Sequence, residues 1–220
     1  MGYRHRFIQA SCELPLGKVV CVGRNYAEHA KELNNPVPTT PILFMKPATA
    51  VVPLEPEFSI PAGLGECHHE TEVALLIGTN LTRASVEQAR NAIVGYGLGL
   101  DLTLRDIQNS LKVNGHPWEI AKGFDGACPL SAFVPAAEIE VPELLTLKLT
   151  INDVVRQSGC VSDMIMPMFE LVAYISKHFT LQAGDVVLTG TPAGVGPLAA
   201  GDRLALCLNG KYPFSTSVQR

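Results

Sequence analysis

The chain has few charged residues, few aromatic residues and no excess of basic residues. Among 220 residues, Asp, Glu, Lys and Arg make up 17% and Phe, Trp and Tyr only 6%. The formal net charge is −4 and no basic stripe is present, which argues against a nucleic-acid backbone as the main partner. Hydrophobic residues reach 47%, so we expect one domain over residues 1–220 with a substantial core. The small share of charged residues also predicts that part of the surface is buried between subunits.

Cysteine pairs and long apolar runs are also missing. None of the cysteines belongs to a Cys-x-x-Cys pair (Cys12, Cys21, Cys67, Cys128, Cys160 and Cys207). This scatter predicts reduced thiols in the core and argues against a disulfide framework or a zinc site. No stretch approaches the roughly 20 apolar residues of a membrane span, and no apolar signal-peptide core lies near the N-terminus. We therefore expect a cytoplasmic protein with no membrane partner.

The glycine-rich segments do not fit the nucleotide-binding patterns. Gly95, Gly97 and Gly99 fail Gly-x-Gly-x-x-Gly because Leu100 occupies the last position. The loop 189–197 lacks the Gly-Lys-Ser/Thr of a phosphate-binding loop, so nucleotide binding is not expected. Its backbone N–H groups and the Thr191 hydroxyl could instead face a small anion.

Hydrophobic patterning indicates a β-rich α+β fold with a few flanking helices. Strand patterns are found at 18–22, 42–46, 69–77, 94–102, 146–151, 154–157, 186–189 and 203–208. Helical patterns are found at 24–33, at 85–93 with Ser85 as N-cap, and at 162–178 with an interruption or fresh start near Pro167. Asn152-Asp153 and Asn209-Gly210 predict hairpin turns. Regular βαβ alternation is absent, which argues against a Rossmann domain.

Three acidic residues interrupt these apolar strands. Side chains alternate along a strand, so Glu70 and Glu72 must project from the same face. Asp101 ends a second strand whose residues of the same parity are the glycines 95, 97 and 99. Three such carboxylates become tolerable around Mg²⁺ or Mn²⁺, which prefer oxygen ligands. The alternative is that the glutamates lie on a solvated sheet face and Asp101 caps the following helix.

Further polar groups could serve catalysis, although each also has an ordinary structural explanation. His29 and Glu32 share a helix face, where a carboxylate can orient an imidazole that activates water, or both can simply be solvated. Arg105 and Gln108 follow Asp101 closely and could bind a substrate carboxylate, or form an ordinary amphipathic helix. Lys122 lies among apolar neighbours and could stabilise an enolate, or extend its ammonium group to solvent.

Several motifs, taken in order, resemble the small single-domain branch of the fumarylacetoacetate hydrolase family. They are Gly23-Arg24-Asn25-Tyr26, Leu43-Phe44-Met45-Lys46-Pro47, His68-His69-Glu70-Thr71-Glu72, Leu100–Asp106, Lys122-Gly123-Phe124-Asp125 and Gly184–Pro192. The likeness spans about residues 18–208. It implies a mixed β-roll or sandwich fold, a homodimer, and one Mg²⁺ or Mn²⁺ per subunit held by Glu70, Glu72 and Asp101.

The resemblance also implies roles for the weaker candidates. His29, Glu32 and Lys122 correspond to catalytic positions of the family, with His29 and Glu32 on a segment that orders over the substrate. The positions expected to contact substrate are Arg24, Tyr26, Arg105, Gln108 and Thr191.

The reaction expected first is hydrolysis of a C–C bond in an acylpyruvate such as fumarylpyruvate, with release of pyruvate. The same metal-enolate chemistry also serves oxaloacetate decarboxylation, oxaloacetate keto-enol tautomerisation and isomerisation of hydroxymuconate-type diacids, and the metal ligands do not separate these reactions. A non-catalytic small-molecule-binding dimer is the alternative of another class.

Overall fold

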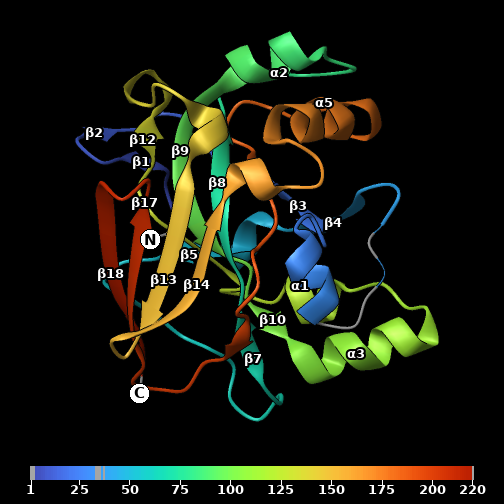
Figure 1. The fold of residues 1–220 in the computed structure, drawn as a ribbon, viewed down its shortest axis with the longest axis vertical. Coiled ribbons are helices and arrows are strands. Elements are labelled where there is room, and N and C mark those ends of the chain that lie inside the picture. Colours follow the sequence, from blue (N-terminus) through green and yellow to red (C-terminus); the bar gives the residue numbers. More distant parts are fainter. Residues whose placement is uncertain (1–2, 33–35, 37, 220) are drawn as a thin grey trace.

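A mixed eight-stranded sheet forms the centre of the molecule in the computed structural model, which describes residues 3–32, 36 and 38–219 (Figure 1). Its strand order is β4-β3-β15-β8-β9-β11-β5, and β12 pairs with β9. The strands are β3 (Val19–Gly23), β4 (Ile42–Lys46), β5 (Val51–Pro53), β8 (Thr71–Ile77), β9 (Ile93–Leu100), β11 (Cys128–Leu130), β12 (Val134–Pro135) and β15 (Val186–Leu188).

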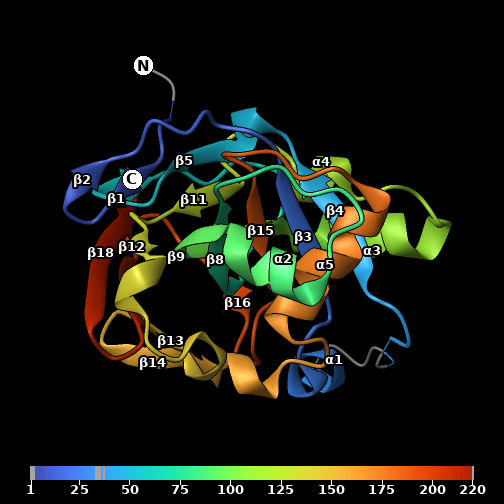
Figure 2. The ribbon, with the colours of Figure 1, turned by 90° about the horizontal axis from the view of Figure 1, so that it is seen from above.

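A second sheet of five strands lies over one face of the first and has the order β14-β13-β17-β18-β6 (Figure 2). It consists of β6 (Glu57–Phe58), β13 (Thr146–Ile151), β14 (Val154–Cys160), β17 (Arg203–Leu208) and β18 (Tyr212–Val218). Both predicted hairpin turns are present. Asn152 and Asp153 have φ of 49° and 67°, the left-handed conformation that a two-residue hairpin turn requires.

Small sheets and helices complete the fold. β7 (Cys67–His69) lies between β10 (Thr103–Leu104) and β16 (Gly196–Pro197), and β1 (Arg6–Phe7) pairs with β2 (Ala10–Ser11). The α-helices are α1 (Ala27–Glu32), α2 (Val86–Ala92), α3 (Arg105–Asn114), α4 (Glu119–Lys122) and α5 (Met168–His178). Short 3₁₀ turns are η1 (Ala48–Ala50), η2 (Ala136–Glu138), η3 (Pro142–Leu144) and η4 (Val161–Asp163).

Helix boundaries follow local capping chemistry. Ser85 accepts the N–H of Gln88 while the Gln88 side chain accepts the N–H of Ser85, a reciprocal capping box that starts α2 where the sequence predicts. α5 begins only after Pro167, so the predicted fresh start is confirmed and its first turn lies at Met168. α2 and α5 pack against each other beside the main sheet (Figure 1). None of the helices in the described part of the chain is long and apolar enough to cross a membrane.

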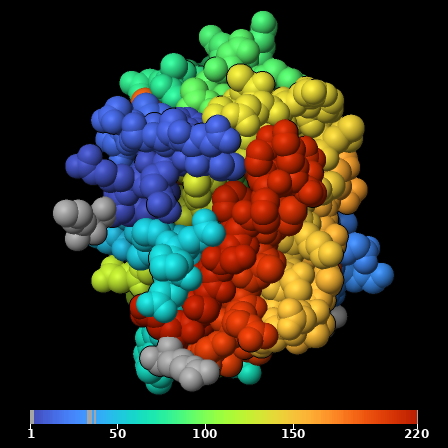
Figure 3. Space-filling model, turned by 90° about the vertical axis from the view of Figure 1, so that its left-hand side faces the viewer, coloured from blue at the N-terminus to red at the C-terminus, as the bar shows by residue number. Residues whose placement is uncertain are grey.

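The main sheet is covered on both faces, and every residue of β8 is buried. Val73, Leu75 and Ile77 point into the core that includes the second sheet and α5. Ala74 and Leu76 point the other way, into a core around Phe133 that the N-terminal segment covers. Figure 3 shows this segment on the surface beside the C-terminal strands.

The glycine face of β9 is filled by an aromatic ring. A Cβ at Gly97 would lie 3.0 Å from Cδ1 of Phe133, and one at Gly95 would lie 3.0 Å from Cβ of Phe133. The sequence predicts that the residues on this face of the strand before Asp101 are glycines without side chains. The structure gives the reason for them. The glycines allow Phe133 to lie directly on the strand, so they serve packing and leave only Asp101 for the functional site.

The N-terminal segment provides a prediction about pH. His5 is 1% exposed, its Nε2 lies 2.8 Å from the carbonyl of Gly184, and its ring packs edge-on against Phe133. Burial lowers the pKa of His5, although the Gly184 carbonyl and Asp185 partly oppose this effect. Below about pH 6.5, His5 therefore binds a proton in the unfolded chain but not in the folded chain. The free energy of unfolding falls as the pH falls.

We expect His5→Gln, whose amide can still donate to Gly184, to lose less stability than the wild type between pH 7.5 and 5.5. The difference should be at most about 1.4 kcal/mol per pH unit. Urea unfolding of both proteins at the two pH values measures it. Equal losses in the two proteins would show that His5 does not titrate as described.

Candidate metal centre and active site

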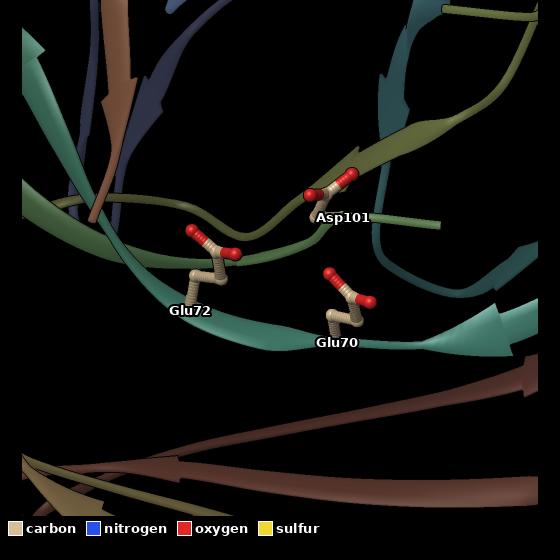
Figure 4. Close-up of side chains that lie close together, drawn as sticks. All are labelled: Glu70, Glu72 and Asp101. Atoms are coloured by element: carbon tan, nitrogen blue, oxygen red, sulfur yellow. The ribbon is translucent and has the colours of Figure 1, made fainter. Parts of the chain in front are cut away.

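Three carboxylates converge at one end of the main sheet, as the sequence predicts. Glu70 joins β7 to β8, Glu72 lies in β8 opposite Gly99 of β9, and Asp101 directly follows β9. One oxygen from each lies within 4.8 Å of the others, and the residues are 5%, 1% and 1% exposed (Figure 4). The alternative of a solvated sheet face is therefore wrong. Asp101 does not cap α3 either, because the N-cap position of that helix is Leu104.

Buried cations compensate two of the three carboxylates. Nζ of Lys122 lies 2.9 Å from Oε2 of Glu70 and 2.7 Å from Oδ2 of Asp101. Arg105 pairs with the other oxygen of Glu70, and Nζ of Lys46 lies 2.8 Å from Oδ1 of Asp101. Lys122 is 2% exposed, so the alternative of a lysine extending into solvent is wrong.

The charges of Lys122 and Glu70 stabilise each other. Burial alone would raise the pKa of Glu70, but the Lys122 ammonium and the Arg105 guanidinium outweigh it and hold this pKa below the ordinary value. Burial likewise would lower the pKa of Lys122, and the carboxylates of Asp101 and Glu70 raise it instead. Both groups are therefore charged at neutral pH.

Glu72 has no such compensation. Among the described residues it accepts one hydrogen bond, from the backbone N–H of Gly190 at 2.6 Å, and it forms no ion pair with any of them. Burial and the charges of Asp101 and Glu70 raise its pKa well above the ordinary value. Asp101 Oδ1 is buried and lacks a well-oriented hydrogen bond, despite its nearness to Lys46. All these donors are hard oxygens, and the uncompensated charge fits Mg²⁺ or Mn²⁺.

His29 and Glu32 form the pair that their spacing predicts. Nδ1 of His29 lies 3.4 Å from Oε2 of Glu32 on α1, and the imidazole is 5% exposed. The other Glu32 oxygen accepts the N–H of Gly194 at 3.0 Å. Because Nδ1 faces the carboxylate, Nε2 is the ring nitrogen left for the pocket, which His29 lines. The carboxylate thus orients the imidazole against the glycine-rich loop.

A pocket that is partly open to solvent brings most of the predicted residues together. Its lining residues are Val22, Gly23, Arg24, His29, Phe44, Glu70, Glu72, Asp101, Arg105, Gln108, Lys112, Trp118, Lys122 and Thr191. Arg105 reaches Oε1 of Gln108 at 2.6 Å, so the predicted substrate-contacting pair is linked. Arg24 has a φ of 62°, a left-handed conformation that is strained for a long side chain and is typical of functional sites.

Two predicted substrate contacts are placed differently. Tyr26 is 3% exposed, belongs to the hydrophobic core and is not among the pocket residues, because its ring packs between α1 and the second sheet. Thr191 lines the pocket, but its hydroxyl accepts from Gln157 at 2.7 Å and donates to the carbonyl of Thr71 at 2.8 Å. A substrate would therefore meet the Thr191 backbone before a free hydroxyl. The last residue of the predicted helix 24–33 lies outside the described residues.

Sequence reasoning assigned no role to three buried polar residues around the pocket. Lys46 is 0% exposed. The sequence feature that could have indicated its burial is a lysine at the end of an apolar strand, directly before Pro47. Asn25 donates to the carbonyls of Thr189 and Met166, and Gln157 bonds Thr191. An amide on a strand or in a loop gives no local indication of such partners, because they lie more than 30 positions away.

The chain is similar to known proteins along nearly its whole length. The family model for the fumarylacetoacetate hydrolase C-terminal domain matches residues 18–219. Oxaloacetate tautomerase YcgM of Escherichia coli is 52% identical over 211 residues, 96% of each chain. The mitochondrial oxaloacetate tautomerase FAHD1 of Bos taurus is 42% identical, over 92% of this chain and 91% of its own.

A solved structure of fumarylpyruvate hydrolase from Pseudomonas aeruginosa in complex with Mn²⁺ and pyruvate has a TM-score of 0.93 and 35% identity, over 99% of this chain and 96% of that one. The chain belongs to the fumarylacetoacetate hydrolase family, and it is an enzyme of that family. The fold expected from the resemblance is confirmed.

The electrostatics of Glu72 predict how metal affects stability. We expect Mg²⁺ or Mn²⁺ to stabilise the wild-type protein by about 2.7 kcal/mol at a hundred times the dissociation constant. Glu72→Gln should abolish this effect, yet be at least as stable as the wild type in EDTA, because it removes a charge that Asp101 and Glu70 repel. Thermal unfolding with EDTA and with each metal tests this. An unchanged metal response in Glu72→Gln would contradict the assignment of the ligands.

Proposed function

We propose that the protein is a divalent-metal-dependent oxaloacetate tautomerase, which interconverts the enol and keto forms. The observation that carries this proposal is 52% identity across nearly the whole chain to an oxaloacetate tautomerase, combined with a buried three-carboxylate site. From the sequence, C–C bond hydrolysis is the reaction expected first. The relatives support tautomerisation, its stated alternative, better than hydrolysis.

The charge of the pocket suits a small dicarboxylate. Four cationic side chains line it, Arg24, Arg105, Lys112 and Lys122. Burial lowers the pKa of Lys112, and the positive charges of Arg24 and Arg105 in the same pocket lower it further. The two carboxylates of oxaloacetate would relieve this repulsion, because each can accept charge-assisted hydrogen bonds.

Glu70, Glu72 and Asp101 would hold the cation. When bound, it supplies Lewis-acid polarisation of the substrate's 2-oxygen and adjacent carboxylate. Lys122, kept charged by its two carboxylate partners, stabilises negative charge on the 2-oxygen of the enolate. Arg105 with Gln108 binds one carboxylate, and Arg24 with Lys112 binds the other.

Tautomerisation moves one proton and leaves the carbon skeleton intact. In the enol-to-keto direction the 2-hydroxyl loses a proton and C3 gains one. His29, oriented by Glu32, is the pocket group placed to deliver the proton to C3. Lys122 then needs only to neutralise charge, which agrees with its raised pKa.

We expect the Mg²⁺- or Mn²⁺-loaded protein to accelerate loss of enol-oxaloacetate absorbance without a matching release of pyruvate. Glu72→Gln should lower the rate at least 100-fold, and His29→Gln about 10²- to 10⁴-fold, the usual range for a proton-transfer group. The loss of enol absorbance and the release of pyruvate are followed in the same sample, the second with a coupled assay. Pyruvate release equal to enol loss would contradict tautomerisation.

The proposed role of Arg24 in binding a substrate carboxylate predicts an effect on KM. Arg24→Gln should raise KM for oxaloacetate about tenfold or more and change kcat much less, because it removes binding shared by ground and transition states. Val113→Thr, on the exposed side of α3 at 87% exposure, is the matched control and should leave both constants unchanged. A fall in kcat with constant KM would assign Arg24 to the chemistry instead.

Acylpyruvate hydrolysis is the second candidate, and the His29–Glu32 pair favours it. An imidazole with a carboxylate on its second nitrogen is suited to removing a proton from water. Fumarylpyruvate and metal in the same two-product assay would then release pyruvate, and His29→Gln would abolish that release. A wild-type protein that turns over oxaloacetate enol and leaves fumarylpyruvate intact would exclude this candidate.

We also propose a homodimer. Val154 and Val155 are 52% and 51% exposed at adjacent positions in the edge strand β14. Exposed apolar side chains that lie together are typical of an interface with another protein chain. Light scattering coupled to size-exclusion chromatography measures the mass in solution.

A further inference from the structure

Gln157 is a buried amide that reaches from the second sheet to the site. It lies in β14 and is 1% exposed. Oε1 of Gln157 accepts from the N–H of Thr71 at 3.0 Å and from Nδ1 of His69 at 3.1 Å. Nε2 of Gln157 donates to Thr191 Oγ1 at 2.7 Å and to the carbonyl of Pro192 at 2.9 Å. All four hydrogen-bonding positions of the amide are therefore used.

The partners fix the orientation of this amide. The backbone N–H of Thr71 can only donate and the carbonyl of Pro192 can only accept, so the oxygen must face Thr71 and the nitrogen must face Pro192. His69 then carries its proton on Nδ1. The Thr191 hydroxyl, which accepts from Gln157, must direct its own hydrogen to the carbonyl of Thr71. A single arrangement satisfies every group, which favours a rigid network.

The amide oxygen bonds the residues on both sides of Glu70. His69 ends β7 and Thr71 begins β8, so Glu70 lies at the break between two strands. Its carbonyl accepts the N–H of Asp101 at 2.8 Å, but regular sheet pairing does not continue through the residue. Gln157 holds the backbone where that pairing is interrupted.

The amide nitrogen holds the loop that contacts the second glutamate. Thr191 and Pro192 directly follow Gly190, whose backbone N–H donates to Glu72. One side chain thus connects the backbone that carries Glu70 to the loop that orients Glu72. Groups that orient metal ligands in this way set metal affinity as well as geometry.

We propose that Gln157 is a positioning residue that fixes Glu70 and the 189–192 loop in the arrangement that binds the divalent cation. The inference rests on the metal site of the proposed function and does not depend on which reaction that site catalyses. Gln157 itself touches neither cation nor substrate, so its effect is read first on metal binding.

The test compares Mn²⁺ binding by the wild type and Gln157→Met, with isothermal titration and the electron paramagnetic resonance spectrum of bound Mn²⁺. We expect the variant to bind Mn²⁺ about 10- to 100-fold more weakly, the usual effect of removing such a partner. We also expect an altered spectrum, because the ligands are no longer held in one geometry. Gln157→Asn keeps the amide but is one methylene shorter, so it should weaken binding too and serves if Gln157→Met does not fold.

Ser176→Ala is the matched control. Ser176 is also a buried polar residue, 2% exposed, and its hydroxyl accepts from the N–H of Ala84 at 2.9 Å and donates to the carbonyl of Ala173 at 2.8 Å. It lies on α5, and the hydrogen bonds described for it go to Arg83, Ala84 and Ala173, which are outside the site. This variant should lower the melting temperature while its Mn²⁺ affinity stays within twofold of the wild type.

The outcomes separate this inference from the proposed function. Wild-type affinity and spectrum in folded Gln157→Met or Gln157→Asn would overturn the positioning role. Equal weakening of Mn²⁺ binding in Ser176→Ala would also overturn it, because loss of stability alone would then explain the effect. Failure of the wild type itself to bind Mn²⁺ through Glu72 would instead overturn the metal site of the proposed function.

Discussion

The burial of three carboxylates at one end of a sheet is the constraint on which the rest of this structure depends. Charges of one sign this close together are expensive to remove from water, so the surrounding chain must provide compensation. Lys46 comes from β4, Arg105 from the start of α3 and Lys122 from the end of α4. Segments distant in sequence are thus drawn to one place by electrostatics as well as by apolar packing.

The compensation is uneven, and the unevenness is informative. Lys122 and Arg105 form ion pairs with Glu70, and Lys122 and Lys46 form ion pairs with Asp101. In the part of the chain that the structure describes, Glu72 receives only a backbone N–H. A protein selected for stability alone would be better served by an apolar or neutral side chain at Glu72. The acidic side chain at this position is explained by a task that a neutral side chain cannot perform, and the task proposed above is to hold a hard cation.

The sequence was a good guide to strands and turns but a poor one to the surroundings of the site. Alternation in 69–77 placed Glu70 and Glu72 on one face, and Asn152-Asp153 placed a hairpin, because both patterns depend on local backbone geometry. The resemblance located His29 and Lys122. Tyr26 lies in the core, and the Thr191 hydroxyl is used internally, because motif membership does not say which way a side chain points. Gln157 was missed because its partners come from other strands.

The strand order of the main sheet also affects how the chain can fold during synthesis. β3 pairs in parallel with β15, so residues 19–21 wait for partners at 186–188, and Lys18 and Asp185 form an ion pair across the same separation. Loop closure over such a distance is slow compared with local pairing. During synthesis β3 can pair early with β4, but its other neighbour β15 does not yet exist, so most of the protein must be translated before the centre of the sheet can close.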